Sequence, residues 1–317
     1  MRVTPLFVLV VLLLAVAGVS GCATWSAERK APMVGEWIDV EGERIHAFTA
    51  GPRDGDKPPV VLIHGASANL RDMQMSLGEK LSRDRFVVMV DRLGRGYSER
   101  PKDGYALDVQ ARYIHGVVQS YGLKNPLVVG QSLGGAVALN YALQYQEEMT
   151  GLVLLAPVSH QWPGGIAWYN SASQIPVVGF LLRRLVIPIY GQLAAEDGIE
   201  ETFLPDAAPE NYYQRSGLAL LFRPGDFRSN ASDIAHLKQE IIRQQDRYGE
   251  LQLPVAIMTG TSDTTVSPEI HSKTLATQID GATLTLFPDT GHALHHSQTE
   301  KIIETIDQLS AADAAMR

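Results

Sequence analysis

The sequence has almost no cysteine: Cys22 is the only one among 317 residues. No disulfide can form within the chain, so the fold must depend on a packed apolar core. Basic residues are also scarce, with 27 Lys and Arg against 35 Asp and Glu and a formal net charge of −8. Because no basic run is present, we expect no nucleic-acid partner.

Two cofactor signatures are missing as well. Gly94 and Gly96 follow Asp91 but lack the G-x-G-x-x-G spacing of a dinucleotide site. His292, His295 and His296 have a spacing that could align metal ligands on a helix, yet no cysteine motif or carboxylate accompanies them in the sequence. We therefore expect neither a cofactor nor a metal ion.

The amino terminus carries an unbroken apolar run over residues 6–17, preceded by one positive charge at Arg2. The run is too short for a comfortable membrane span and is typical of a signal peptide. Val19-Ser20-Gly21-Cys22 follows and resembles a bacterial lipobox, with the sole cysteine at the lipid-attachment position. We predict a lipoprotein signal peptide over residues 1–21 and lipidation of Cys22, with an ordinary secretory signal as the alternative.

Lipidation of Cys22 would attach the exported protein to a membrane without spanning it, because two or more acyl chains anchor stably. Residues 22–34 would then be the lipidated cysteine and a polar tether. The residue that follows the cysteine is Ala23 and not an aspartate. This resembles outer-membrane sorting in a Gram-negative cell and predicts a location on the periplasmic side.

The most informative motif is Gly130-Gln131-Ser132-Leu133-Gly134. An apolar segment precedes it and a helical pattern follows it, so the motif predicts a strand, a sharp turn and a helix, which together form a nucleophile elbow. The turn holds its serine in a strained backbone conformation. Gly130 and Gly134 are needed because a Cβ at either position would collide with neighbouring backbone.

A serine hydroxyl becomes a nucleophile when a histidine takes its proton, and a carboxylate orients that histidine. In folds with this elbow the chain order is serine, acid, histidine. Asp263 follows the predicted strand 255–259, and His292 follows the predicted strand 283–287. We therefore predict that Ser132, Asp263 and His292 meet at the edge of the sheet where ligands bind in open α/β folds.

Other residues compete for these roles. Asp289 is a rival acid, although its place shortly before the histidine suits a turn. His295 and His296 are rival bases. His64 is expected to be structural, packing under the loop that follows the apolar strand 60–63.

An acyl-transfer site also needs donors for the oxyanion. The backbone amide of Leu133, at the start of a helix, is the first predicted donor. The second comes from the loop His64-Gly65-Ala66-Ser67, and we assign it to Ala66.

These motifs together resemble the α/β-hydrolase superfamily. The matching residues are His64-Gly65, the segment 91–98, the elbow, Gly260-Thr261-Ser262-Asp263 with Val266-Ser267-Pro268, and Gly291-His292. The resemblance implies a mostly parallel sheet with helices on both faces, and a supporting loop at residues 91–98. Strands are predicted at residues 37–40, 44–50, 60–63, 86–91, 127–129, 152–156, 255–259 and 283–287.

The superfamily members that open epoxides or displace halide carry an aspartate where this chain has Ser132. The resemblance therefore implies a hydrolase of carboxylic esters or thioesters, with a small-molecule or lipid ester as substrate. C–C bond hydrolysis or acyl transfer by the same triad is an alternative, and a non-catalytic binding lipoprotein is another. The sequence itself assigns no acyl length and no oligomeric state.

The chain divides into a core, residues 35–156 and 251–317, and an insertion, residues 157–250. The insertion is far longer than an ordinary connection and resembles the cap of this superfamily. Trp168 and Phe180 lie in its most apolar part and are predicted to contact the acyl group. A lid that touches membrane, or a cap with a small core of its own, are the other interpretations.

Overall fold

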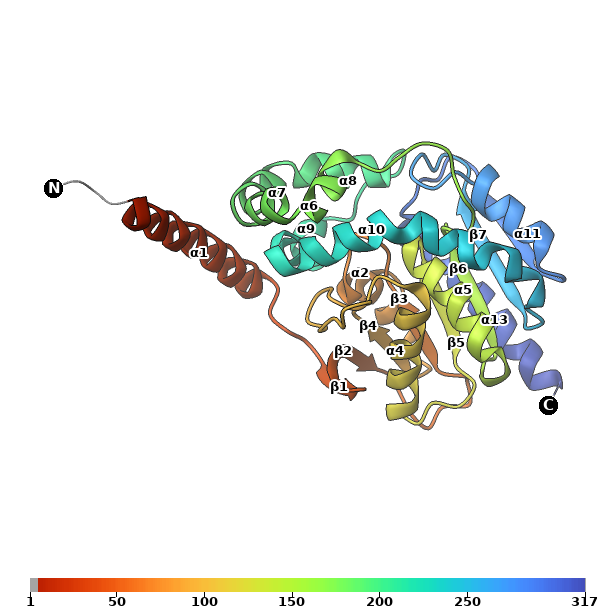
Figure 1. Ribbon diagram of the computed structural model, residues 1–317. Helices are drawn as coiled ribbons and strands as arrows, with labels where there is room; N and C mark the ends of the chain where they lie inside the picture. Colours follow the sequence, from red (N-terminus) through yellow and green to blue (C-terminus); the bar gives the residue numbers. More distant parts are fainter. Residues whose placement is uncertain (1–4, 317) are drawn as a thin grey trace.

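Eight strands form one sheet in the order β1-β2-β4-β3-β5-β6-β7-β8 (Figure 1). The computed structural model describes the backbone of residues 5–316 and the side chains of Phe7, Leu14 and residues 16–311. The pairs β1–β2 and β2–β4 are antiparallel, and all other neighbours are parallel. The strands are β1 (Glu36–Val40), β2 (Glu43–Ala50), β3 (Val60–Ile63), β4 (Val87–Val90), β5 (Leu127–Gln131), β6 (Gly151–Leu155), β7 (Val255–Gly260) and β8 (Thr283–Phe287). The α/β fold and all the strands expected from the sequence are confirmed.

The strand register brings the predicted site loops to one edge. Ile63, the last residue of β3, pairs with Val90 of β4 and with Gly130 of β5. The loops that begin at His64, Asp91 and Gln131 therefore leave the sheet side by side. The central strands β3 to β7 are buried along their whole length, as expected for short apolar runs in a sheet covered on both faces.

Alternate strand residues feed two separate cores. Val61, Ile63 and Val128 pack under one set of helices, whereas Val60, Leu62 and Val129 pack under the other. The first set comprises α4 (Leu107–Ser120), α5 (Leu133–Tyr145) and α11 (Thr274–Gln278). The second comprises α2 (Leu70–Met73), η1 (Gln74–Gly78), α3 (Glu79–Leu81), α12 (Leu294–Ser297) and α13 (Thr299–Met316). Two further short helical turns, η2 (Gln146–Glu148) and η6 (Glu269–Lys273), also belong to the part of the chain outside the cap.

The interval between β6 and β7, called here the cap segment (residues 157–250), is helical. It holds α6 (Trp168–Gln174), α7 (Pro176–Leu181), η3 (Leu182–Gly191), α8 (Ala195–Phe203), α9 (Tyr212–Arg215), η4 (Leu218–Phe222), α10 (Pro224–Gln244) and η5 (Gln245–Glu250). Figure 1 shows α6 to α9 gathered above one end of the sheet, with α10 crossing between them and the core. Leu182, Ile187, Phe222 and Phe227 form a small apolar cluster within this segment.

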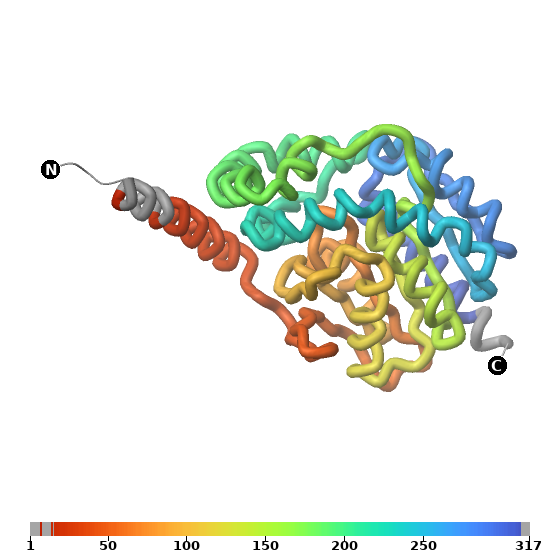
Figure 2. The backbone as a smooth tube through the Cα atoms, viewed as in Figure 1, coloured from red at the N-terminus to blue at the C-terminus, as the bar shows by residue number. Residues whose placement is uncertain are grey.

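The amino-terminal helix α1 (Pro5–Lys30) runs through Cys22 and leads into β1 (Figure 2). Residues 23–30, predicted as part of a polar tether, are helical. α1 packs against η3 and η4 of the cap segment, and Glu28 forms an ion pair of 2.9 Å with Arg223. Arg2, which belongs to the signal-peptide prediction, lies outside the described residues.

Within the described part of the chain, no single helix has both the length and the apolar character to cross a membrane. The segments Trp168–Gln174 and Pro176–Gly191 meet the same criteria only together, as a pair bent by 108°.

Candidate active site

Ser132 occupies the turn between β5 and α5 with φ 56° and ψ −119°. A positive φ is strained for a residue with a Cβ, and such strain is commonly found at functional sites. A Cβ on Gly130 would lie 2.4 Å from the Gly134 carbonyl oxygen, and a Cβ on Gly134 would lie 2.5 Å from the His64 carbonyl oxygen. The predicted need for both glycines is confirmed, and the turn has the geometry of a nucleophile elbow.

The structure brings Ser132, His292 and Asp263 together in the predicted order. The Ser132 Oγ lies 3.0 Å from His292 Nε2, and His292 Nδ1 lies 2.7 Å from Asp263 Oδ2. All three side chains are buried. A serine, a histidine and a carboxylate within hydrogen-bond reach are the arrangement needed to activate a hydroxyl nucleophile.

Backbone amides fix the carboxylate of Asp263. Its Oδ1 accepts hydrogen bonds of 2.8 Å from the amides of Thr265 and Val266, which leaves Oδ2 for His292. The rival acid Asp289 is exposed in the turn after β8, with φ 51°. Its place is the turn that the sequence suggests for it, and Asp263 holds the position on His292.

The two predicted oxyanion donors are both available. Among the described residues, neither the amide of Leu133 nor that of Ala66 has a hydrogen-bond acceptor. Leu133 is the first residue of α5, where helical amides have no partner within the helix. The loop of Ala66 lies against the nucleophile, because a Cβ on Gly65 would come within 3.1 Å of the Ser132 Cβ.

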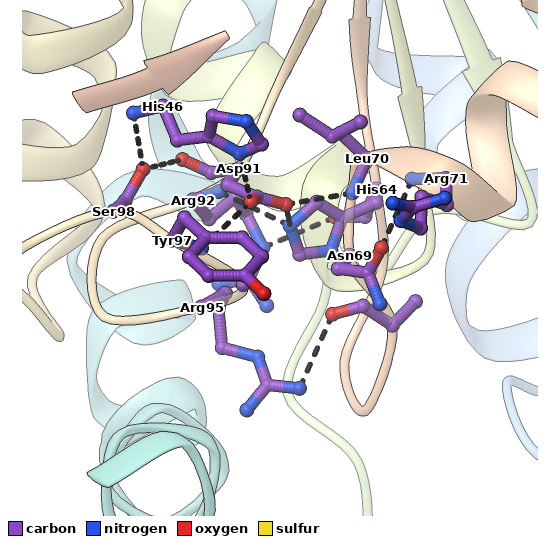
Figure 3. A network of polar contacts seen from close by, with 12 residues as sticks. His46, His64, Asn69, Leu70, Arg71, Asp91, Arg92, Arg95, Tyr97 and Ser98 are labelled. Carbon is purple, nitrogen blue, oxygen red and sulfur yellow. Dashed lines mark hydrogen bonds and ion pairs between the residues drawn. The ribbon is translucent and has the colours of Figure 1, made fainter. Parts of the chain in front are cut away.

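Arg92 and His64 hold the loop that carries Ala66 (Figure 3). The Arg92 guanidinium donates to the carbonyls of His64 and Gly65, each at 3.1 Å. Burial, together with the charge of Arg92, lowers the pKa of His64 to about 3. The neutral ring accepts a hydrogen bond of 3.1 Å from the Arg92 amide, so the geometry of His64 is that of a structural residue.

Asp91, at the end of β4, joins three neighbouring segments (Figure 3). Its Oδ1 accepts from the Leu70 amide at 2.7 Å, and its Oδ2 contacts His46 Nδ1 at 2.6 Å and the Tyr97 amide at 2.9 Å. Although burial alone would raise the pKa of Asp91, the hydrogen bond and charge of His46 lower it. The segment 91–98 thus supports the site without reaching Ser132.

The sequence did not identify the contribution of α10 to the site. Asn230 accepts from the Ser67 amide at 2.7 Å and donates to the Ser67 hydroxyl at 3.1 Å. Asp233 forms a buried ion pair of 2.7 Å with Arg92. No local pattern links these residues to the loop, because Ser67 and Asn230 are 163 positions apart.

A cavity of about 420 Å³ extends from the loop of Ala66 into the cap segment. Its apolar wall includes Trp168, Ile187, Phe203 and Phe222. Among the residues that line it, Glu201 alone is charged at neutral pH, and none is Lys, Arg or His. This is the size and character of a site for a small apolar ligand.

The two predicted acyl contacts are placed differently. Trp168 lines the cavity, although 71% of its surface is exposed. Phe180 does not line it; the Arg184 guanidinium lies 4.4 Å above its ring instead. The acyl contact of Phe180 therefore stays a prediction that the lining of this cavity does not support.

His295 and His296, the rival bases, turn toward Asp72 of α2. Each Nε2 lies 2.8 Å from one carboxylate oxygen, and the Tyr212 hydroxyl donates to the same group at 2.9 Å. Burial alone would raise the pKa of Asp72, but the two histidines lower it well below its usual value. The carboxylate that the sequence did not place beside these histidines thus comes from another element.

Asp72, His295 and His296 are also close enough to hold a metal ion. A metal-bound histidine normally donates its other ring N–H to an acceptor. His295 Nδ1 is buried without a hydrogen-bond partner among the described residues, which suits a bare acceptor nitrogen better than a buried N–H. The donor set therefore fits a hydrogen-bonded cluster in which both imidazoles donate to an ionised Asp72.

Comparisons with known proteins agree with this geometry. A family model described as the alpha/beta hydrolase fold matches residues 58–176. A 2-hydroxymuconate semialdehyde hydrolase from Pseudomonas putida is 29% identical over 91% of this chain and 99% of its own. A monoacylglycerol lipase from Xenopus laevis is 37% identical over 38% of this chain and 37% of its own.

Among solved structures, an esterase from Exiguobacterium antarcticum superposes with a TM-score of 0.70 at 24% sequence identity. The match covers 88% of this chain and 100% of the esterase. At this identity the likeness establishes the fold and leaves the reaction to be argued from the site.

Proposed function

We propose that this chain is a serine hydrolase of carboxylic esters with an apolar acyl group. The chain has the α/β-hydrolase fold, and the comparisons support its membership of that superfamily. The observation that carries the proposal is the hydrogen-bonded chain from Ser132 through His292 to Asp263. A serine, a histidine and a carboxylate linked by hydrogen bonds in this way make the serine hydroxyl nucleophilic.

In the proposed reaction, Ser132 attacks the ester carbonyl while His292 Nε2 accepts its proton. Asp263 keeps the proton of His292 on Nδ1 and stabilises the imidazolium that forms. The amides of Leu133 and Ala66 donate to the oxyanion. His292 then protonates the leaving alcohol, and water attacks the acyl-enzyme by the same route.

The cavity supports an apolar acyl group. Its wall is mostly aliphatic and aromatic, and it begins at the loop that carries the proposed oxyanion donor Ala66. Each methylene that moves from water into such a cavity contributes about 0.8 kcal/mol. The sequence similarity to a monoacylglycerol lipase over part of the chain points to the same class of substrate.

C–C bond hydrolysis is the second candidate, because the relative from Pseudomonas putida acts on 2-hydroxymuconate semialdehyde. A muconate carries a carboxylate, which needs a cationic partner when it is buried. The cavity offers Glu201 and no basic side chain among its lining residues, so its charge favours a neutral ester.

The location proposed from the sequence is a lipoprotein anchored through Cys22. Cys22 is exposed on α1 and lies outside the sheet and its cores. Mass spectrometry of the membrane fraction should find an acyl-modified amino-terminal peptide. Its absence would refute the lipid anchor while leaving the reaction untouched.

The reaction itself is tested by comparing wild type with Ser132→Ala on p-nitrophenyl esters of increasing chain length and on a ring-cleavage dienoate. The proposal expects hydrolysis of medium-chain esters by wild type, none by the variant, and little action on the dienoate. Preferential cleavage of the dienoate would establish the second candidate instead.

A further inference from the structure

The segment from α6 to Leu193, just past η3, exposes more large apolar side chains than any other part of the described chain. Its exposed large apolar residues, called here the cap apolar face, are Trp168, Tyr169, Ile175, Val177, Val178, Leu181, Val186, Ile189, Tyr190 and Leu193. Single exposed apolar residues need no explanation, but many of them gathered on one segment indicate an interaction surface.

The cap apolar face includes residues of a segment that also buries apolar side chains. Val186, Ile189 and Tyr190 of the π-helix η3, and Leu193 just beyond it, are exposed. Leu182 and Ile187, from the same stretch, are buried in the small core of the cap segment. The segment therefore has apolar side chains both in this small core and on its solvent-exposed side.

The charged side chains near the cap apolar face favour one kind of binding partner. The chain has 35 acidic residues, yet residues 149–195 contain no Asp or Glu. Arg183 and Arg184 are the charged residues of this stretch other than its histidine. Glu196 and Asp197 of α8 follow directly. Within α6, α7 and η3 the charged side chains are basic, which suits a bilayer with anionic head groups.

The amino-terminal helix lies beside this face. α1 packs against η3, and Lys30 reaches Gln192 at 3.4 Å. Figure 1 shows α1 leaving the body of the protein at the end where α7 lies. Phe7, Leu14, Val19 and Trp25 of α1 are exposed as well. A membrane that holds α1 or a lipid on Cys22 is therefore within reach of the cap segment.

We propose that the cap apolar face binds the surface of a lipid bilayer, with Arg183 and Arg184 near the head groups. Trp168, Val186 and Tyr190 belong both to this face and to the lining of the cavity. A lipid ester can then move from the bilayer along an apolar path to the loop of Ala66, which lies beside Ser132. The path rests on the proposed function, whereas the bilayer contact does not.

The contact can be measured without any catalysis, in the full chain carrying Cys22→Ser so that one new cysteine can be labelled. Bimane is attached at Val177→Cys or Leu193→Cys, which lie outside the cavity lining, and at Thr285→Cys as a control on the exposed side of β8. Each protein is mixed with phosphatidylcholine and phosphatidylglycerol vesicles whose acyl chains are brominated. Because α1 is the same in all three, differences report the cap segment alone.

The proposal expects loss of bimane fluorescence at positions 177 and 193 and none at position 285. Equal fluorescence at all three positions would overturn it, since α1 would then be the whole attachment. A change in bimane fluorescence at positions 177 and 193 that appears without vesicles and grows with protein concentration would also overturn it. That result would indicate that a second copy of the chain covers the face.

A second measurement separates the face from the reaction. Val177→Asp with Leu193→Asp should lower hydrolysis of a lipid ester in vesicles while leaving hydrolysis of a soluble acetate ester unchanged. Leu286→Asp, at an exposed apolar position on β8, is the matched control and should change neither. An unchanged ratio of vesicle to soluble activity in the double variant would contradict the proposal. If no ester is cleaved at all, the proposed function fails and the fluorescence result still decides the contact.

Discussion

At the scale of residues, the position of the acid decides how the proposed triad works. Asp263 has one oxygen held by two backbone amides and the other on His292, so its carboxylate cannot rotate away. Such a fixed carboxylate selects the tautomer in which His292 Nε2 is free to accept a proton.

Asp263→Asn should lower kcat for ester hydrolysis by about 10⁴-fold, because the amide would favour the wrong tautomer of His292. Asp289→Asn is the matched control and should have little effect, since Asp289 is exposed in a turn. Steady-state kinetics on one soluble ester measure both. A larger loss in Asp289→Asn than in Asp263→Asn would show that the acid is misassigned.

The catalytic candidates were predictable because each follows directly after an apolar strand, where parallel strands place their loops at a common edge. Ser132, Asp263 and His292 needed only local patterns and this rule. Asn230 and Asp72 could not be found in this way. Their contacts join α10 to Ser67 and α2 to His295, and the sequence gives no rule for how the cap segment or α12 packs against the core.

At the scale of elements, the cap segment supplies the wall of the cavity, and it is where chain-length preference should lie. Trp168→Ser should lower activity on longer esters and spare acetate esters, by up to about fourfold for each methylene that loses its contact. Phe180→Ser should leave the profile unchanged, since Phe180 does not line the cavity. A chain-length series of p-nitrophenyl esters measures both variants. A uniform loss in Trp168→Ser would mean that this residue holds the cap in place instead.

Asp72 ties α2 to α12 and, through Tyr212, to α9 of the cap segment. Asp72→Asn should lower the free energy of unfolding by about 1–3 kcal/mol, because one buried donor would lose its acceptor. The exposed Asp280→Asn serves as a control and should change little. Urea unfolding measures both changes.

The same cluster predicts that EDTA leaves the melting temperature unchanged, since the histidines donate to the carboxylate and no ion is required. A fall in melting temperature with EDTA that zinc reverses would contradict the hydrogen-bonded interpretation.

At the scale of the whole molecule, buried histidines make stability depend on pH. Burial lowers the pKa of His64 to about 3 and that of His271 to about 4. The unfolded chain binds a proton at each near pH 6.5, and the folded protein does not, so stability falls as the pH drops below 6.5. Burial raises the pKa of Asp226 to about 6. The folded protein therefore binds one proton there that the unfolded chain does not, which raises stability as the pH falls.

The net expectation is a loss of about 1.4 kcal/mol for each pH unit between pH 6 and 5, because the two histidines outweigh the one carboxyl group. Urea unfolding at fixed ionic strength measures it. An unfolding free energy that stays level or rises from pH 7 to pH 5 would contradict the burial of neutral histidines.

The architecture was predictable from the order of apolar strands and helical patterns, with strand ends within a few residues. The conformation of residues 23–30 was not. Their polar composition suggested a tether, but alanine, glutamate, arginine and lysine also favour helix, and contacts with η3 and η4 stabilise that choice.

The central claim is that Ser132 is the nucleophile of a serine hydrolase. Its most direct test is intact-mass and peptide mass spectrometry after treatment with a fluorophosphonate, using wild type and Ser132→Ala. We predict one adduct per chain, on the peptide that contains Ser132, and no adduct on the folded variant. An adduct that persists in Ser132→Ala, or a wild-type protein that never reacts while its triad geometry is intact, would contradict it.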